Sequence, residues 1–585
     1  MFNRFPYTNF HDLNLDWIIS EIRRVGNQVD SFSSDLRAYV REYLAEYLDG
    51  DSLDVAGLAC GFVNIRAFGL PEDGGDCTEA FEEAVKFCNR YKVNLRCNEG
   101  ERYTVLSPVV ERMMMSVDCN NSTFIMGGSD VEAAFLTFGE AAINRTYVSS
   151  DYNGVFTPAE LKNATFFLQT EIDIGLREGT EYHLKAGRMI VTDPSGFPVN
   201  GTLTFDLSAG FRALNIRNRG VQPHRFVKNA NIEYGSYSGT KMLGFALSDV
   251  DNFTFENINV SGQLGNGAVF TGSVLKCKYV DGCVFRNING SNPTLENGSG
   301  YVIGVYGSNG TIIDRCGLND GVSRSWGVMG GNFLSNTTVT NSDMQRIDCH
   351  YLSYGFLTVD NCSIQLMQLP EGGEGVIIIQ NSNIDSRSFS PIVRRREVPI
   401  LFNGEIVIKD CSVTPSRTSA GSLLDYTLPD NDIVYGADSR ISIAIVNCKM
   451  RNMTYPVLID GKGRLNTPTV RVEGCTIDLG VRAGIVRSET VEDISIDIVG
   501  CNIYGNCTVA YANTLAKLRY ITCALNPYNP TGIPAECSYI GCRIPSLSGV
   551  YNKLLIVGCV AQHQVMNATF TECVKVGNLP SGWTD

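Results

Sequence analysis

The sequence predicts an all-β fold in which the chain winds into stacked coils of parallel strands, preceded by a helical segment. Three observations lead to this prediction. An eight-residue pattern recurs along the C-terminal two-thirds of the chain, and its fifth position is occupied by Asn, Asp or Gly. The fifth positions Asn341, Asn361 and Asn381 follow one another at spacings of 20 residues. A repeated unit of strand, corner and strand indicates a solenoid.

The first element is a helix predicted over residues 13–48. Its apolar residues alternate at spacings of three and four: Leu15, Ile18, Ile22, Val25, Val29, Phe32, Leu36, Tyr39 and Tyr43. A 3.5-residue period favours a left-handed coiled coil. The alternative is an amphipathic helix that packs on the chain's own β-domain. We assign residues 1–50 to this stalk, whose seam alone does not define the number of chains.

Residues 51–110 are expected to close the N-terminal end of the solenoid. The segment 64–105 predicts a strand, a Gly-rich turn, a helix that begins at Thr78 and two short strands. One face of that helix is apolar, with Ala80, Phe81, Ala84, Val85 and Phe87. Because a solenoid exposes its core at each end, such a helix would cover it.

This segment resembles the opening of the pectate-lyase-like superfamily of right-handed β-helices, which is common in phage tail spikes. The matching residues are Phe68–Gly69, Asp73–Gly74, Asp76 with Thr78, Ala80 and Ala84, Gly100 and Tyr103. The chain departs from the pattern by the extra residues Leu70–Pro71 and by Asn98 in place of a usual Pro. The resemblance implies a right-handed parallel β-helix that assembles as a homotrimer.

The first residues carry a second resemblance. The segment FPYTNFHDLNLDWII (5–19) is similar to an N-terminal module ahead of β-helix proteins in small podoviruses of Gram-positive gut bacteria. This resemblance implies that residues 1–50 attach the protein to other virion proteins. It says nothing about chemistry.

Residues 111–250 are β-rich, with Gly, Asn and Pro turns, and predict early coils with insertions. Residues 251–585 are assigned to the main parallel β-helix. In each repeat the apolar residues occupy positions 1 and 3 and then positions 6 and 8. The alternation therefore changes phase within the repeat, which indicates a corner between two strands. Residue types that tolerate positive φ stand at this corner: Asn257, Asn287, Asn361, Asn381, Asp410, Asn447, Gly474 and Gly500. The sixth position is often Cys, which we interpret as a buried column of small groups rather than as disulfides.

Composition narrows the function classes. The chain of 585 residues has a formal net charge of −14, which argues against nucleic acid as the main partner. Its 20 cysteines form no zinc-type cluster, so no metal or cofactor is expected. The start lacks the apolar core of a signal peptide, and no 18-residue apolar run predicts membrane insertion. We therefore expect a virion protein that is made in the host cytoplasm, released by lysis and active outside the host cell.

Polar residues gather in the most regular repeats, 335–385. Coils stack about 4.8 Å apart, so residues one or two repeats apart lie about 5 or 10 Å apart. These distances bracket the separations of glycosidase carboxylates. The expected outward columns are Thr340, Asp360 and Gln380; Asp343, Ser363 and Asn383; and Gln345, Gln365 and Asp385. Such columns suit sugar hydroxyls and equally suit a solvated sheet face.

Candidate site residues follow from these columns and the adjoining segments. Acids beside a histidine can transfer protons, so the catalytic candidates are Asp343, Asp348, His350, Asp360 and Asp385. Aromatic rings stack on sugars, so the glycan-binding candidates are Trp326, Tyr351, Tyr354, Glu371 and Glu374. The ordinary alternatives are a tryptophan between subunits and a histidine on the surface.

Two classes of function stay open. In one, the protein is a phage tail spike or appendage that binds a surface polysaccharide during host attachment and depolymerises it as a hydrolase or lyase. In the other, it is a non-enzymatic receptor-binding or structural fibre of the head or neck. An exported bacterial lyase is disfavoured because no signal peptide is recognised.

Overall fold

The computed structural model describes residues 61–577 with internal gaps, and the chain divides into two compact units. The first unit comprises residues 1–141 and 222–302, and the second comprises 142–221 and 303–585. The predicted coiled coil and attachment segment in residues 1–50 lie outside the described residues. The gaps are 73, 129–132, 140–143, 148–163, 174–182, 192–210, 219–222, 236–240, 249, 263–272, 279, 291–300, 319–328, 387–389, 395–401, 416–421, 428–440, 454, 461–468, 480–485, 489–493, 508–516, 529–535, 545–546 and 562–565.

The first unit winds as a parallel solenoid. Its strands are β1 (Phe62–Asn64), β2 (Asn94–Arg96), β3 (Arg102–Val105), β4 (Val117–Met126), β5 (Ala134–Phe138), β10 (Arg225–Tyr234), β11 (Leu243–Ser248), β12 (Phe253–Gly262), β13 (Ser273–Lys278) and β14 (Cys283–Gly290). Strands one coil apart pair in parallel, as β4 with β10, β10 with β12 and β12 with β14 do. This register stacks Val117, Val227, Phe255 and Phe285 in one buried column.

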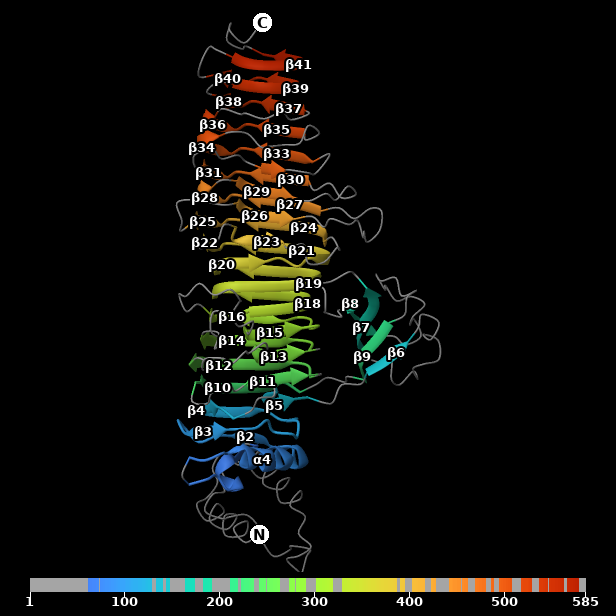
Figure 1. The fold of residues 1–585 in the computed structure, drawn as a ribbon, viewed down its shortest axis with the longest axis vertical. Coiled ribbons are helices and arrows are strands. Elements are labelled where there is room, and N and C mark those ends of the chain that lie inside the picture. The colour runs from blue at the N-terminus through green and yellow to red at the C-terminus, as the bar shows by residue number, and fades with distance from the viewer. Residues whose placement is uncertain are drawn as a thin grey trace, which may run out of the picture. The chain divides into compact units, whose positions relative to one another are not determined.

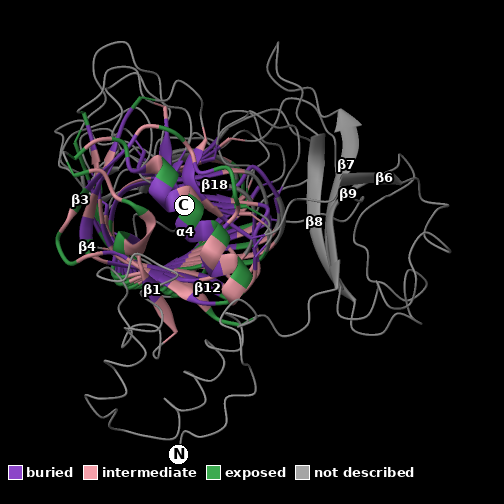
Figure 2. Cartoon of the chain, turned by 90° about the horizontal axis from the view of Figure 1, so that it is seen from below, coloured by how far each residue is buried: buried purple, intermediate pink, exposed green. Residues whose placement is uncertain are grey.

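A helix covers the core at the N-terminal end of this unit. Helix α4 (Thr78–Tyr91) follows the short 3-10 helix η2 (Ile65–Phe68). Phe81 of α4 is buried, and its ring centroid lies 5.5 Å from that of Tyr103, 5.8 Å from Phe124 and 5.0 Å from Phe135. Figure 2 shows α4 across the end of the coil. The helix thereby shields from water the first apolar layer of the solenoid.

The second unit contains a four-stranded antiparallel sheet and a long parallel solenoid. The antiparallel sheet has the order β6-β9-β7-β8, from β6 (Asn144–Tyr147), β7 (Ala164–Asp173), β8 (His183–Val191) and β9 (Phe211–Asn218). In the sequence, these strands are inserted between β5 and β10 of the first unit. All pairings within this small sheet are antiparallel, in contrast to the solenoid.

The solenoid of the second unit extends from β15 to β41 as a stack of parallel strands (Figure 1). Its register is continuous, so that Val339, Val359, Ile379, Ile408, Ile445, Val472 and Ile498 form one buried column. The predicted parallel solenoid is therefore confirmed. Its strands are β15 (Tyr301–Tyr306), β16 (Ile312–Asp314), β17 (Gly317–Leu318), β18 (Met329–Thr340), β19 (Asp343–Asp360), β20 (Ser363–Gln368), β21 (Gly372–Gln380), β22 (Asn383–Ser386), β23 (Ile392–Arg394), β24 (Phe402–Lys409), β25 (Ser412–Pro415), β26 (Ser422–Thr427), β27 (Ile441–Val446), β28 (Lys449–Met453), β29 (Tyr455–Asp460), β30 (Thr469–Glu473), β31 (Thr476–Leu479), β32 (Val486–Ser488), β33 (Ser495–Val499), β34 (Asn502–Cys507), β35 (Lys517–Ile521), β36 (Ala524–Tyr528), β37 (Glu536–Ile540), β38 (Arg543–Ile544), β39 (Leu547–Val557), β40 (Val560–Ala561) and β41 (Met566–Val576).

The coils turn at residues with positive φ. The φ angles are 55° at Asn257, 53° at Asn287, 52° at Asn361, 51° at Asn381, 55° at Asp410, 54° at Asn447, 63° at Gly474 and 61° at Gly500. Asn361 donates its backbone N–H to the carbonyl oxygen of Gln380 at 3.1 Å, next to the Asp360–Gln380 register pair. Asn361 and Asn381 therefore occupy equivalent places in neighbouring coils.

A column of free cysteines lies just inside these corners. Its members are Cys362, Cys411, Cys448, Cys475, Cys501, Cys523, Cys542 and Cys559, all buried and none in a disulfide. Their thiols interact with backbone carbonyls, as Cys448 Sγ does with Val446 O at 3.3 Å and Ile408 O at 3.5 Å. The predicted column of small buried groups is thus confirmed. Within the described residues, no helix is long and apolar enough to cross a membrane.

Candidate functional site

The outward side chains of β19, β21 and β24 in the second unit form a surface that we call the lateral face. Burial alternates along β19: Leu357 and Val359 enter the core, whereas Phe356, Thr358 and Asp360 point outward. The parallel register repeats this alternation in the next two strands. The lateral face therefore consists of Phe356, Thr358, Asp360, Val376, Ile378, Gln380, Glu405, Val407 and Lys409.

The lateral face combines an exposed aromatic ring with polar groups. Phe356 is 43% exposed, so part of its ring is open to solvent. Half-buried Ile378 and Val407 continue an apolar strip across the next coils, whereas Glu405 lies at the edge of the strip. Along the corner side, Asp360, Gln380 and Lys409 supply hydrogen-bonding groups. A sugar ring has one apolar side and a rim of hydroxyls, so its chemistry matches this surface.

Asp360 is tied to the corner residues. Its Oδ1 accepts a hydrogen bond from Asn381 Nδ2 at 2.8 Å. In the preceding coils, Asn361 Nδ2 donates to Asn341 Oδ1 at 2.9 Å, and Asn341 Nδ2 donates to Asp314 Oδ1 at 3.0 Å. These amides join successive coils on the outside and orient the Asp360 carboxylate.

Two carboxylates share the column that contains Asp360. Asp314 pairs in register with Thr340, which pairs with Asp360. A two-coil spacing corresponds to about 10 Å, slightly above the separation typical of an inverting glycosidase pair. Asp314 is also bound by Arg315, whose Nε lies 3.0 Å from its Oδ2. The sequence reasoning placed Asp360 in this column but missed Asp314, although Asp314 precedes a corner in the same way.

Asp343 and Asp385 lie across the corner from the lateral face. Both are exposed. Asp343 starts β19 in register with Ser363, which is in register with Asn383. Asp385 comes two residues after Asn383 and pairs with Thr414. These acids therefore lie in two neighbouring columns beyond the corner and not on the surface that carries Phe356.

The other two catalytic candidates lie in the middle of β19. Asp348 is 0% exposed, and its Oδ1 lies 2.7 Å from the Nε of Arg346, which is itself 5% exposed. His350 Nδ1 lies 3.2 Å from Gln368 Nε2. A buried charge is tolerated when it is paired in this way. In this structure the Asp348 carboxylate is sealed from solvent, whereas His350 is half-buried.

The expected outward position of Gln345 is wrong, since Gln345 is buried. Met344 and Ile347 both point into the core although they are three residues apart. The strand therefore changes phase between them, and simple alternation from the corner does not extend to Gln345. Such a second bend leaves no Asn, Asp or Gly as a marker in the sequence.

Three of the glycan-binding candidates lie on β19 and β21, and Glu371 directly precedes β21. Glu371 is buried, and its backbone oxygen accepts hydrogen bonds from Arg394 Nε at 3.0 Å and Nη2 at 2.8 Å. Tyr351 and Tyr354 lie in β19, and Tyr354 is in register with Glu374 of β21. Trp326 lies outside the described residues. Because Glu371 is buried, the structure does not place the whole predicted set on the surface. It adds Phe356, which the alternation of FLTVD (356–360) could have revealed, and Glu405 and Lys409, which the alternation of EIVIK (405–409) could have revealed.

Outward columns nearer the C-terminus differ from the lateral face. Arg519 binds Asp497 through two hydrogen bonds of 2.6 and 2.5 Å. Lys553 lies 3.9 Å from both Glu536 and Glu572. These alternating charges are typical of a solvated sheet face and add little stability. Across the described part of the chain, no group of three His, Cys, Asp or Glu residues could hold a metal ion.

Comparisons with known proteins find similarity only among solved structures. No protein-family model matches the sequence, and no curated protein is similar to it. The tailspike protein gp49 from Pseudomonas phage LKA1 is 12% identical with a TM-score of 0.47, over 75% of this chain and 77% of that one.

Two further solved structures show the same level of similarity. The Gp54 tailspike of Acinetobacter baumannii bacteriophage AP22, in complex with an A. baumannii capsular saccharide, is 12% identical with a TM-score of 0.42, over 83% of this chain and 79% of that one. PfbA, a surface adhesin of Streptococcus pneumoniae, is 10% identical with a TM-score of 0.38, over 85% and 90%. Because these TM-scores are below 0.5, we assign the fold from the strand pairing within this chain and not from the comparisons.

Proposed function

We propose that the chain is a spike or appendage of a phage virion that binds a bacterial surface glycan through the lateral face. The observation that carries this proposal is the exposed ring of Phe356 in line with Thr358 and Asp360 on one solvent-facing strand. The virion role is supported by the two sequence resemblances in residues 5–19 and 64–105. A right-handed winding agrees with the strong preference of parallel crossover connections.

The lateral face suits a polymer better than a small molecule. Its polar and apolar columns continue through β19, β21 and β24 at a repeat of about 4.8 Å, so several sugar residues can lie along it. Stacking on Phe356 would provide an anchor, and Asp360, Gln380 and Lys409 would bind hydroxyl groups. Such an anchor typically carries a large share of the binding energy.

The test is a retention assay of the full chain on intact host cells and on purified capsule or wall polymer. We expect Phe356→Ser to weaken retention about tenfold, which corresponds to ~1.4 kcal/mol. The matched control is Tyr504→Ser, because Tyr504 is 45% exposed but lies on β34, outside the lateral face. Equal retention of wild type and Phe356→Ser would refute the lateral face as the binding surface.

A second candidate function is depolymerisation of the bound glycan, favoured by the two-coil spacing of Asp314 and Asp360. Depolymerisation is measured in the same incubation, as the appearance of new reducing ends or unsaturated uronates. An enzyme that uses this pair loses product with Asp360→Asn, and one that uses Asp343 or Asp385 loses it with those substitutions. If the protein is retained but forms no product, it is a non-enzymatic fibre. This assay does not test the proposed homotrimer or the proposed attachment through residues 1–50.

A further inference from the structure

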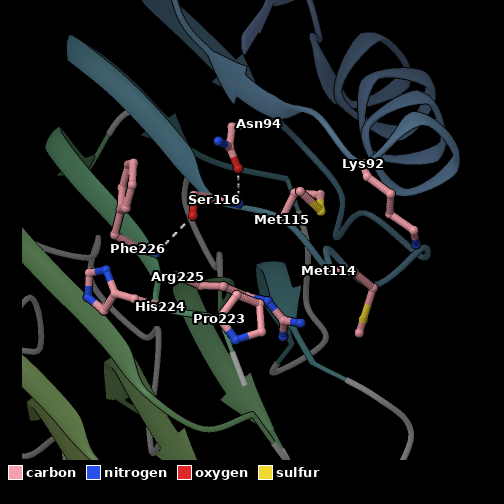
Figure 3. Close-up of a pocket in the computed structure, with 9 residues that line it drawn as sticks. All are labelled: Lys92, Asn94, Met114, Met115, Ser116, Pro223, His224, Arg225 and Phe226. Carbon is pink, nitrogen blue, oxygen red and sulfur yellow. Dashed lines mark hydrogen bonds between the residues drawn. The ribbon is translucent and has the colours of Figure 1, made fainter. Parts of the chain in front are cut away.

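The first unit contains a pocket of about 480 Å³ beside the end of α4 (Figure 3). Three segments that are distant in the sequence contribute to it. Lys92 and Asn94 follow the helix, Met114–Ser116 precede β4, and Pro223–Phe226 lead into β10. The volume falls within the range of small-molecule sites.

Hydrogen bonds between successive coils hold the floor of the pocket. Ser116 donates its backbone N–H to Asn94 Oδ1 at 2.9 Å, and its Oγ accepts the backbone N–H of Phe226 at 3.2 Å. His224 Nε2 lies 2.8 Å from Thr254 Oγ1 in the next coil. The lining residues are therefore positioned before a ligand arrives, which reduces the entropy cost of binding.

The charge of this pocket is opposite to that of the chain. The whole sequence has 62 acidic and 48 basic residues, yet the nine lining residues include Lys92 and Arg225 and no carboxylate. Figure 3 shows Lys92 at the end of α4, Arg225 at the start of β10 and His224 directly before that strand. Two cationic groups of a preformed pocket favour an anionic ligand.

The walls of the pocket are apolar. Met114, Met115, Pro223 and Phe226 line it beside the polar groups. Phe226 presents an aromatic ring, and the Lys228 Nζ lies 5.0 Å from its centroid. An inorganic anion would leave these walls unused, whereas the apolar side of a sugar ring would cover them.

We propose that this pocket binds an anionic sugar residue, whose ring contacts the methionines and Phe226 and whose charged group contacts Arg225 and Lys92. This is a site separate from the lateral face, and it gives the protein a preference for acidic glycans. Carboxylate and phosphate groups share the required chemistry, and the experiment distinguishes them.

The test is calorimetric titration of the full chain with glucuronic acid, glucose 6-phosphate and glucose. We expect at least one anion to bind and glucose not to bind, and the anion that binds defines the group. Arg225→Gln should raise its Kd about tenfold. Lys92→Asn should act in the same direction while preserving the backbone, because Lys92 has a φ of 56° that Asn tolerates.

Two controls separate this site from the rest of the molecule. Lys86→Gln removes an exposed charge of α4 that does not line the pocket, so it should leave the Kd unchanged. Phe356→Ser should likewise leave it unchanged, even where it abolishes polymer retention. Absence of binding by both anions, equal binding of glucose, or a Kd that neither Arg225→Gln nor Lys92→Asn alters in folded protein would overturn the proposal.

Discussion

At the residue scale, a single backbone conformation decides where each coil turns. Asn361 adopts a φ of 52° and also donates its side-chain amide to Asn341 Oδ1 at 2.9 Å. At Gly474, a β-carbon would lie 2.5 Å from Asn447 Oδ1. At the corner residue Gly500, in contrast, a β-carbon would meet nothing within 4 Å. Positive φ is therefore the requirement that these corners share, and the hydrogen bond of Asn361 is an addition to it.

Replacing Asn361 tests this explanation. Asn361→Leu should lower the free energy of unfolding by about 1–3 kcal/mol, because a leucine would have to adopt positive φ. Asn361→Gly keeps the backbone and loses only the side-chain hydrogen bond, so its loss should be smaller, about 1 kcal/mol. Urea unfolding measures both. A leucine variant as stable as the wild type would contradict the assignment of the corner.

At the element scale, the strands that follow the corners bury thiols instead of larger apolar groups. Burial raises the pKa of Cys362, which follows the corner at Asn361, to about 11, and it raises the pKa of Cys537, which lies on β37 before the corner at Gly541, to about 12. The folded protein therefore holds these protons at a pH where the unfolded chain, with thiols near pH 9, releases them. Their contribution to stability is complete below pH 9 and is lost as the pH rises towards 11 and 12.

We expect the free energy of unfolding to fall between pH 9 and pH 11, with thiols contributing to the slope. Urea unfolding of the wild type and of a variant with Cys362→Ala and Cys537→Ala measures that contribution. The variant should be less stable at pH 8 because of the cavities, but its stability should fall less steeply with pH. If the free energy of unfolding falls equally steeply with pH in the wild type and in the variant, these two thiols do not cause the pH dependence.

At the scale of the whole molecule, the number of chains in the particle decides what surrounds the lateral face. The seam of residues 13–48 predicts a coiled coil without defining its number of chains, and the resemblance of residues 64–105 leads us to expect three. Substituting Ile18→Asp and Ile22→Asp in that seam should dissociate the particle at protein concentrations where the wild type contains three chains, as measured by sedimentation equilibrium.

The matched control for this prediction is Arg23→Asp with Arg24→Asp, which lies off the seam. It should leave three chains together. A seam variant that remains as trimeric as this control would mean that the solenoid alone holds the chains together. A wild-type protein that sediments as a monomer would refute the proposed trimer.

The sequence by itself determined the parallel solenoid and the places where it turns. This was possible because both signals are local and recur in every repeat. They are the alternation of the strands and the tolerance of Asn361, Asp410 or Gly474 for positive φ. The buried thiols were predictable for the same reason. The buried columns of the coil can thus be predicted without knowing which distant residues lie nearby.

Only the tertiary structure decided which outward residues share a surface. Asp348 follows the same outward pattern as Asp360, yet it is sealed beside Arg346. The pocket joins residues 92–94, 114–116 and 223–226, with the strands of 144–218 inserted in the sequence between them. Whether an outward side chain meets water depends on what distant segments place over it, and no local period of the sequence records that.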